Sequence, residues 1–273
     1  MVHAISEDRL AHLFGTGGAH GPIVAPEFEA GRLEFQPDSA EQAAHLGFGV
    51  GHHLLIDHPG RSAGRSGIDH ITRFDAAAFA CRFAGEVKGF DIAQYIPAKE
   101  ARHMDTFIHY GLAASIQAVQ DAGLPSKDEL SEEQAERIGV MVGSGIGGLP
   151  MIEETHAEFV NRGPRRISPF FVPASIINMI AGHVSMKFGF KGPNIAIVTA
   201  CTTGLHCIGE GSRMIEYGDA DVVVAGGSEA TISPLGLGGF SVLRIKPAII
   251  GEKVRALKVE MAMAKAIVRA NWR

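Results

Sequence analysis

The sequence predicts an α/β fold in which helices pack on the faces of a buried β-sheet. Short runs of purely apolar residues have the length of strands, and longer segments with apolar residues at helical spacing alternate with them. The chain has 273 residues, of which 46% are hydrophobic and 20% charged. It is therefore long enough to bury a core and too apolar to be disordered throughout.

The first predicted elements are a helix and a strand. Residues 102–123 carry apolar side chains at steps of three and four, and Gly123 is a suitable helix end. These apolar positions are Met104, Phe107, Ile108, Leu112, Ile116 and Val119. The run IGVMV at 138–142 then predicts a fully buried strand, which leads into the glycine-rich sequence GSGIGG.

The same alternation continues along the chain. Residues 173–188 predict a helix, and the β-branched run NIAIVT at 194–199 predicts a strand. A further helix is predicted over 205–217, and DVVVA at 221–225 predicts a strand that ends at two glycines.

Composition divides the chain into three segments, 1–64, 65–240 and 241–273. Eight of the 13 histidines lie in the first 70 residues, where Gly and Pro interrupt every apolar run. His45, His52, His53 and His58 allow a metal cluster as an alternative interpretation, but their spacing fits no standard zinc pattern. The first segment is therefore interpreted as atypical and poorly specified.

The last segment, 241–273, is basic. It holds eight Lys or Arg and two Glu, so its net charge is +6 and the rest of the chain carries −11. Apolar residues at steps of three and four predict an amphipathic helix here. They are Val254, Leu257, Met261, Ala264 and Val268. Such a helix can bind an anionic membrane or a partner groove, and the alternative is a solvated helix packed on its own domain.

The overall composition argues against several classes of protein. The formal net charge of −5 disfavours nucleic-acid binding, and no apolar run of 18 residues predicts a membrane-spanning helix. Three cysteines cannot build a disulfide framework, and the N-terminus does not resemble a signal peptide. We therefore expect a cytoplasmic location.

A glycine-rich loop follows the strand at 138–142. Gly143, Gly145 and Gly148 satisfy the dinucleotide-binding pattern G-x-G-x-x-G, which makes a dinucleotide-binding module one alternative. The acidic residue that should end a second strand about 20 residues later is missing. Close backbone packing beside a pocket is the better interpretation, and neither a cofactor nor a metal is expected.

Cys201 is the candidate nucleophile. It follows the strand NIAIVT and precedes a helix, as in a nucleophile elbow, where helix N-terminal amides stabilise a thiolate. The backbone N–H of the next residue can help to form an oxyanion hole. The alternative is a small buried cysteine, the role expected for Cys207. None of the histidines in the central segment has a local context that marks it as a base, and His183 fits a core position.

The central segment resembles the β-ketoacyl-acyl-carrier-protein synthases of the type II elongating class. The matching stretches include FAGEVKGFD at 83–91, VGSGIGGL at 142–149, GPRRISPFFVP at 163–173, VTACTTGLHCIGEG at 198–211 and YGDADVVVAGGSEATISPLGLGGF at 217–240. They occur in the order typical of that family over about 176 residues.

The resemblance implies a thiolase-like layered αβαβα fold, of which this segment supplies mainly the N-terminal half. It implies that Cys201 accepts an acyl group as a thioester, that Ile146 gates the acyl pocket, and that Phe171 and Phe240 line it. The partner is then an acyl carrier protein that carries acyl or malonyl groups. A homodimer is also implied, in which the strand before Cys201 pairs with its symmetry mate.

The sequence departs from that family at both ends. Residues 1–64 lack its Val-rich first strand, and nothing after Phe240 matches its HGT, Lys…GH or Gly-Phe-Gly-Gly motifs. We expect a truncated chain, as two frame shifts would produce, that does not catalyse the decarboxylative condensation alone. The alternative is a non-catalytic remnant or scaffold that pairs with a complete subunit. Half of a layered fold is expected to leave one sheet face uncovered and the chain poorly soluble or oligomeric.

Overall fold

The computed structural model describes residues 68–242 and the backbone of strand residues 265–269. The strands are β1 (Asp69–His70), β2 (Phe83–Ala84), β3 (Ile138–Gly143), β4 (Asn194–Ile195), β5 (Val222–Gly227) and β6 (Lys265–Arg269). The α-helices are α5 (Ala98–Ala101), α6 (Thr106–Asp121), α7 (Glu132–Glu136), α8 (Leu149–Arg162), α9 (Phe171–Ser175), α10 (Met179–Phe188), α11 (Thr203–Glu216) and α12 (Pro234–Val242). Three short 3-10 helices join them, η1 (Ile92–Gln94), η2 (Pro164–Arg166) and η3 (Ala200–Thr202).

The main sheet has the strand order β4-β3-β5-β6. Strand β3 pairs in parallel with both β4 and β5, and β6 pairs antiparallel with β5. A separate hairpin joins β1 and β2. All six residues of β3 and all six of β5 are buried, which confirms the two apolar runs as interior strands.

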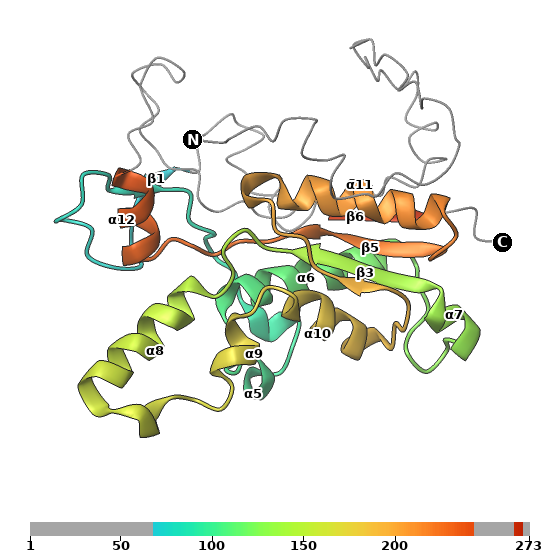
Figure 1. The fold of residues 1–273 in the computed structure, drawn as a ribbon, viewed down its shortest axis with the longest axis horizontal. Helices are drawn as coiled ribbons and strands as arrows, with labels where there is room; N and C mark the ends of the chain where they lie inside the picture. The colour runs from blue at the N-terminus through green and yellow to red at the C-terminus, as the bar shows by residue number, and fades with distance from the viewer. Residues whose placement is uncertain (1–67, 243–264, 270–273) are drawn as a thin grey trace, which may run out of the picture. The chain divides into compact units, whose positions relative to one another are not determined.

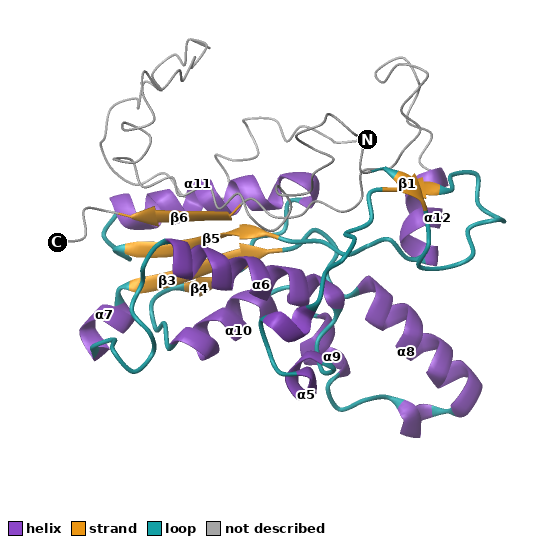
Figure 2. Cartoon of the chain, turned by 180° about the vertical axis from the view of Figure 1, so that it is seen from behind, coloured by secondary structure: helices purple, strands orange, loops and turns teal. Residues whose placement is uncertain are grey.

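Helices cover both faces of the main sheet, with α11 on one side and α6 and α10 on the other (Figures 1 and 2). Successive side chains along each strand point to opposite faces of the sheet. Val140 and Val224 pack into the cluster that includes α6 and α10, whereas Met141 and Val223 pack beside Cys207 of α11. The expectation of one uncovered sheet face is therefore wrong, because helices within this segment cover both.

Helix α6 agrees with its predicted spacing. Asp105 caps its N-terminus by accepting a hydrogen bond from the Phe107 N–H at 3.2 Å. Gly123, predicted as its end, has a φ of +60°, the left-handed conformation that closes many helices.

Two predicted elements are shorter or broken. The helix expected over 173–188 is divided into α9 and α10, because Ile176 is extended, with a ψ of 141°. The strand expected over 194–199 pairs with β3 only at Asn194 and Ile195, and the chain then leaves the sheet toward η3. Helix α8 was not predicted. None of its 14 residues is buried, although its apolar residues Leu149, Ile152, Phe159 and Val160 follow helical spacing.

The prediction of a helix in the basic tail is wrong at its C-terminal end. Val268 lies in strand β6, opposite Val223 of β5. Pairing along β5 satisfies backbone N–H and C=O groups that a strand edge otherwise leaves open, and this gain outweighs helical periodicity. The other predicted helix positions and the first segment, 1–64, lie outside the described residues, as do His45, His52, His53 and His58.

Among the described helices, none is long and apolar enough to cross a membrane. Within residues 68–242, no three His, Cys, Asp or Glu side chains gather in a way that could hold a metal ion.

Candidate active site

Cys201 lies exposed in a sharp turn between strand β4 and helix α11. It is the middle residue of η3, and α11 begins two residues later. The preceding residue, Ala200, has a φ of +53°, which is the only positive φ of a non-glycine residue in the described part of the chain. Such a conformation costs on the order of 1–3 kcal/mol and is typical of functional sites. The arrangement is that of the predicted nucleophile elbow.

Threonine side chains hold this elbow. The Thr199 N–H donates to Thr203 Oγ1 at 3.0 Å, and that hydroxyl donates to the Ala200 carbonyl at 2.8 Å. Thr202 Oγ1 donates to the Thr199 carbonyl at 2.8 Å. Because these bonds bracket Cys201 on both sides, they offset the cost of the Ala200 conformation.

One expected oxyanion donor is already engaged. The Thr202 N–H donates to the Thr199 carbonyl at 3.2 Å, so the amide directly after the nucleophile is not free in this structure. His206 contacts the elbow through Nδ1, which lies 2.7 Å from Thr199 Oγ1. It therefore supports the turn from one side.

Glycines allow the sheet and the elbow to approach each other closely. A Cβ at Gly143 would overlap the Ile197 carbonyl oxygen and lie 2.8 Å from Thr203 Cγ2. A Cβ at Gly227 would lie 3.0 Å from the Gly204 backbone nitrogen. The interpretation of the GSGIGG glycines as close-packing residues is confirmed at Gly143, and at Gly148, where a Cβ would lie 2.6 Å from Ser175 Cα.

The three cysteines differ in environment. Cys207 is fully buried against β3 and β5, and burial raises the pKa of its thiol. Its predicted packing role is confirmed. Cys81 is half-buried, and its thiol donates to the Phe83 carbonyl at 3.4 Å. Of the three, Cys201 is the exposed one.

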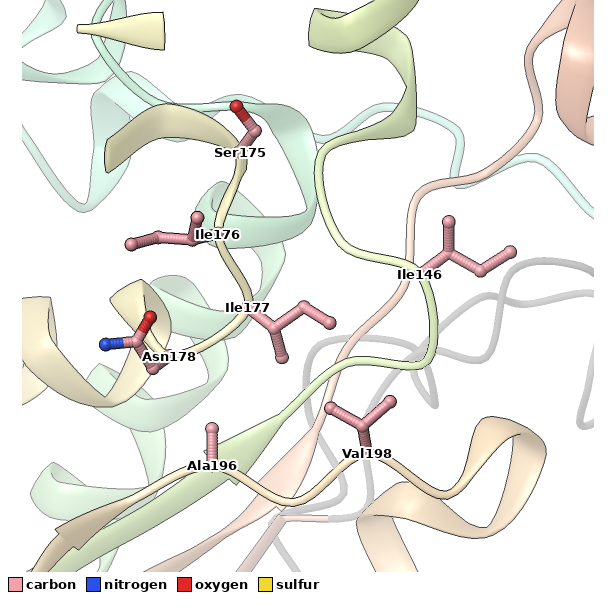
Figure 3. Close-up of a pocket in the computed structure, with 7 residues that line it drawn as sticks. All are labelled: Ile146, Ser175, Ile176, Ile177, Asn178, Ala196 and Val198. Carbon is pink, nitrogen blue, oxygen red and sulfur yellow. The ribbon is translucent and has the colours of Figure 1, made fainter. Parts of the chain in front are cut away.

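An open apolar pocket of about 420 Å3 lies near the elbow (Figure 3). Three segments line it: the loop after β3, the turn between α9 and α10, and the chain that follows β4. The lining residues are Ile146, Ser175, Ile176, Ile177, Asn178, Ala196 and Val198. Its volume is in the range of small-molecule sites, about 300–1,000 Å3.

The structure brings Ile146 to this pocket but places the two predicted phenylalanines elsewhere. Phe171 begins helix α9 and is not among the lining residues. Phe240 lies in α12 and packs against a small cluster that contains Ala84 and Ile232. A role for Phe171 and Phe240 in lining an acyl site stays a prediction.

Comparison with known proteins decides the family. Residues 62–251 match the sequence model described as the N-terminal domain of β-ketoacyl synthases. This chain belongs to the β-ketoacyl synthase family. The match contains the whole predicted central segment, 65–240, and with it the elbow, the glycine loop and the pocket.

Curated relatives of this β-ketoacyl synthase chain carry the name 3-oxoacyl-[acyl-carrier-protein] synthase 2. The one from Vibrio cholerae is 60% identical over 178 residues, which are 65% of this chain and 42% of the relative. The one from Coxiella burnetii is 50% identical over 182 residues, or 67% of this chain and 43% of the relative. The chain thus spans less than half the length of the curated relatives that it matches.

Solved structures confirm the expected ketosynthase fold. The ishigamide ketosynthase/chain length factor has a TM-score of 0.64 at 24% identity, with 77% of this chain and 53% of the other covered. A type II polyketide ketosynthase, solved in complex with its acyl-carrier protein, has a TM-score of 0.60 at 23% identity and covers 69% of this chain and 53% of its own. The α/β architecture found here is the N-terminal half of that thiolase-like fold.

One residue of the candidate site was not predicted from the sequence. Glu229 follows β5, and its carboxylate accepts hydrogen bonds from Ser144 Oγ at 3.2 Å and from the Ile146 N–H at 2.9 Å. Burial raises the pKa of this carboxyl, while the hydrogen bonds oppose that rise. The available signal was an acidic residue directly after a buried strand whose parallel neighbour ends in the glycine loop.

Proposed function

We propose that this chain carries the acyl-accepting half of a 3-oxoacyl-[acyl-carrier-protein] synthase of fatty-acid biosynthesis, with Cys201 as its nucleophile. The observation that carries the proposal is the exposed thiol in a strained turn at the start of α11. A nucleophile needs this access, and the helix N-terminus favours the thiolate that attacks.

The first step is an acyl transfer to sulfur. Cys201 Sγ attacks the thioester carbonyl of an acyl group on the carrier protein, and a new C–S bond forms. The bond to the carrier's sulfur breaks, and the carrier thiol takes up the proton that Cys201 lost. The acyl group is then held as a thioester on the enzyme, which divides one difficult reaction into two easier ones.

The apolar pocket supplies a place for the acyl chain. Ile146, Ile177 and Val198 present aliphatic surface on three sides of an opening near the elbow. Burying each CH2 group of a chain there contributes about 0.8 kcal/mol. The pocket therefore favours an alkyl chain over a small acyl group, and Ile146 is proposed as its gate.

The second step is the condensation. Malonyl-carrier protein loses CO2, and the resulting carbanion attacks the carbonyl of the Cys201 thioester. A C–C bond forms, the C–S bond to Cys201 breaks, and Cys201 leaves as the thiolate. The 273 residues contain no match to the histidine motifs HGT and Lys…GH that the family uses here. We therefore expect this chain, supplied with no other polypeptide, to accept the acyl group and to leave the condensation undone.

Two partners are proposed, an acyl carrier protein and a second copy of the chain. The carrier is supported by the curated relatives' names and by the ketosynthase that was solved with its carrier protein. The dimer is supported by the edge position of β4, where Ile195 is 42% exposed and Val198, just beyond, is 53% exposed. An exposed apolar strand edge is a favourable site for strand pairing.

Acylation of Cys201 tests the proposal. The full chain is incubated with octanoyl-carrier protein, and the acyl group is located by peptide mass spectrometry. We expect one octanoyl group on Cys201, none after Cys201→Ala, and unchanged labelling after Cys81→Ala. Iodoacetamide should likewise alkylate Cys201 before the other two cysteines. Equal reactivity of Cys81, Cys201 and Cys207 would contradict the assignment of the nucleophile.

A scaffold that pairs with a complete condensing-enzyme subunit is the second candidate. It is favoured by α8, which buries no residue and presents Ile152, Phe159 and Val160 to solvent. The scaffold role requires that a Cys201→Ala chain still raises the condensation rate of a complete subunit. A monomer by light scattering, with or without that subunit, would contradict both the scaffold and the homodimer.

A further inference from the structure

The loop that carries Ile146 is held from two sides. On one side, Glu229 accepts hydrogen bonds from Ser144 Oγ and from the Ile146 N–H. On the other side, the Gly148 N–H donates to the Ser175 carbonyl at 3.1 Å. Within the loop, the Gly147 N–H donates to Ser144 Oγ at 3.1 Å, so Ser144 connects the carboxylate to the rest of the turn.

The same loop touches both parts of the proposed active site. Ile146 lines the apolar pocket. A Cβ at Gly145 would lie 2.8 Å from Glu229 Oε2 and 3.4 Å from Ala200 Cα, so Gly145 is enclosed between the carboxylate and the elbow. Glu229 and the nucleophile turn therefore both lie against Gly145, and the next residue of the loop, Ile146, lines the pocket.

The chemistry of this contact requires a carboxylate. Ser144 Oγ and the Ile146 N–H both donate to Glu229, and the backbone N–H groups of Gly145 and Ala230 also stabilise its charged form. An ionised carboxylate accepts from several donors at once, whereas an amide of the same shape has only one accepting oxygen and turns an NH2 group toward donors.

We propose that Glu229 is a positioning residue for acyl-chain selectivity, which fixes the 144–147 turn so that Ile146 forms one wall of the alkyl pocket. The inference rests on the proposed function, because it needs an alkyl chain to enter the pocket from Cys201. Glu229 does not touch the reacting atoms. Its loss changes which acyl groups react, while the intrinsic reactivity of the thiol is retained.

Two probes that differ only in chain length test this role. S-methyl and S-decyl methanethiosulfonate react with a thiolate in the same way: an S–S bond forms to the alkyl-sulfur group, and methanesulfinate leaves. Rates at each cysteine of the full chain are measured by peptide mass spectrometry. The decyl-to-methyl ratio at Cys201 reports the pocket, and the ratio at Cys81 corrects for intrinsic probe reactivity.

The decisive variant is Glu229→Gln. We expect the decyl rate at Cys201 to fall about tenfold, a size expected when charge-assisted hydrogen bonds to one group are lost, and the methyl rate to change less than about twofold. The matched control is Glu153→Gln, which removes a carboxylate that accepts from Ser233 Oγ at 2.6 Å and from the Leu235 N–H at 2.9 Å, at the start of α12. This control should leave the ratio at Cys201 unchanged.

The outcomes separate the two proposals. If wild-type Cys201 shows no greater decyl preference than Cys81, the alkyl pocket is wrong and the role of Glu229 is overturned with it. If wild type has the preference and Glu229→Gln keeps it, only the role of Glu229 is overturned. A parallel loss of both rates also overturns it. Circular dichroism verifies the fold, and if Glu229→Gln does not fold, Ser144→Ala must lower the ratio or the inference fails.

Discussion

Helices α6 and α11 cover opposite faces of one sheet, yet they differ sharply in burial. Eleven of the 16 residues of α6 are buried, including Phe107 and Leu112. Only three of the 14 residues of α11 are buried, and all three are small: Thr203, Cys207 and Gly211. Helix α6 is therefore enclosed in the core, whereas α11 rests on the sheet through a narrow stripe and leaves its other side exposed.

The N-termini of α6 and α11 also differ in the groups that bond their first amides. Asp105 caps α6 and also accepts a hydrogen bond at 2.8 Å from the Met151 N–H in the first turn of α8. Helix α11 has no side-chain cap hydrogen bond at Thr202. The first amides of α11 bond instead within the turn that carries Cys201: the Thr202 N–H donates to the Thr199 carbonyl, and the Thr203 N–H donates to the Ala200 carbonyl. The comparison indicates that α6 stabilises the fold, whereas α11 begins at the exposed turn that is proposed to carry the nucleophile.

The largest expected effect comes from truncating a side chain in each helix. Phe107→Ala in α6 removes a fully buried ring and should lower the free energy of unfolding by about 3–5 kcal/mol. Leu205→Ala in α11 removes a side chain that is 68% exposed and should change it by less than about 0.5 kcal/mol. Urea denaturation followed by circular dichroism measures both. Similar losses for the two variants would show that α11 is as enclosed as α6.

Substitution of two glycines tests how closely the elbow and α11 approach the sheet. Gly143→Ala forces a methyl group into the Ile197 carbonyl oxygen and Thr203, beneath the elbow. We expect a loss of about 3 kcal/mol and slower alkylation of Cys201 by iodoacetamide. Gly209→Ala, on the exposed side of α11, meets no atom within 4 Å and should stabilise the chain by about 0.5–1 kcal/mol. The same denaturation experiment compares them, and an unaffected Gly143→Ala chain would refute the close approach of sheet and elbow.

The third expected effect, somewhat smaller than the losses at Phe107 and Gly143, is a pH dependence at the cap of α6. Burial raises the pKa of Asp105 to about 6, against 3.8 for a free carboxyl. The folded chain thus binds this proton more tightly than the unfolded chain does. The resulting stabilisation is complete below pH 4 and is lost as the pH rises through about 6, by roughly 2–3 kcal/mol.

The Asp105→Asn variant isolates that contribution, because every other titrating group is common to both chains. The difference in unfolding free energy between wild type and Asp105→Asn, measured from pH 4 to pH 7.5, should fall across this interval. A difference that rises with pH would mean that hydrogen bonds from Phe107 and Met151 outweigh burial and lower the pKa of Asp105 instead.

Local patterns in the sequence were sufficient for the elements that bury a regular set of side chains. Strands β3 and β5 are apolar throughout because both of their faces are covered. Helix α6 repeats apolar residues because it packs on the sheet and on α10. Helix α8 was not predicted, although its apolar residues follow helical spacing, and it buries none of its residues. Strand β4 was predicted too long because the β-branched residues Ile197, Val198 and Thr199 leave the sheet near the pocket.

Within the candidate site, too, some features follow from local sequence signals and others depend on distant segments. The sharp turn at Cys201 and the close-packing glycines were predictable, since a turn between a strand and a helix and glycines at close approaches are local signals. Glu229 was not, because its partners Ser144 and Ile146 lie 85 and 83 residues away in the sequence. Only the parallel pairing of β3 with β5 brings the ends of both strands to one sheet edge.

The sequence determined the α/β class, the two interior strands, the nucleophile candidate and the family resemblance, because each depends on residues that are neighbours in the chain or on a long ordered match. Tertiary structure decided which strand pairs with the edge of β5, which helix face stays open and which carboxylate holds the Ile146 loop. Those outcomes depend on contacts between distant segments, where backbone hydrogen bonding and burial override local propensity.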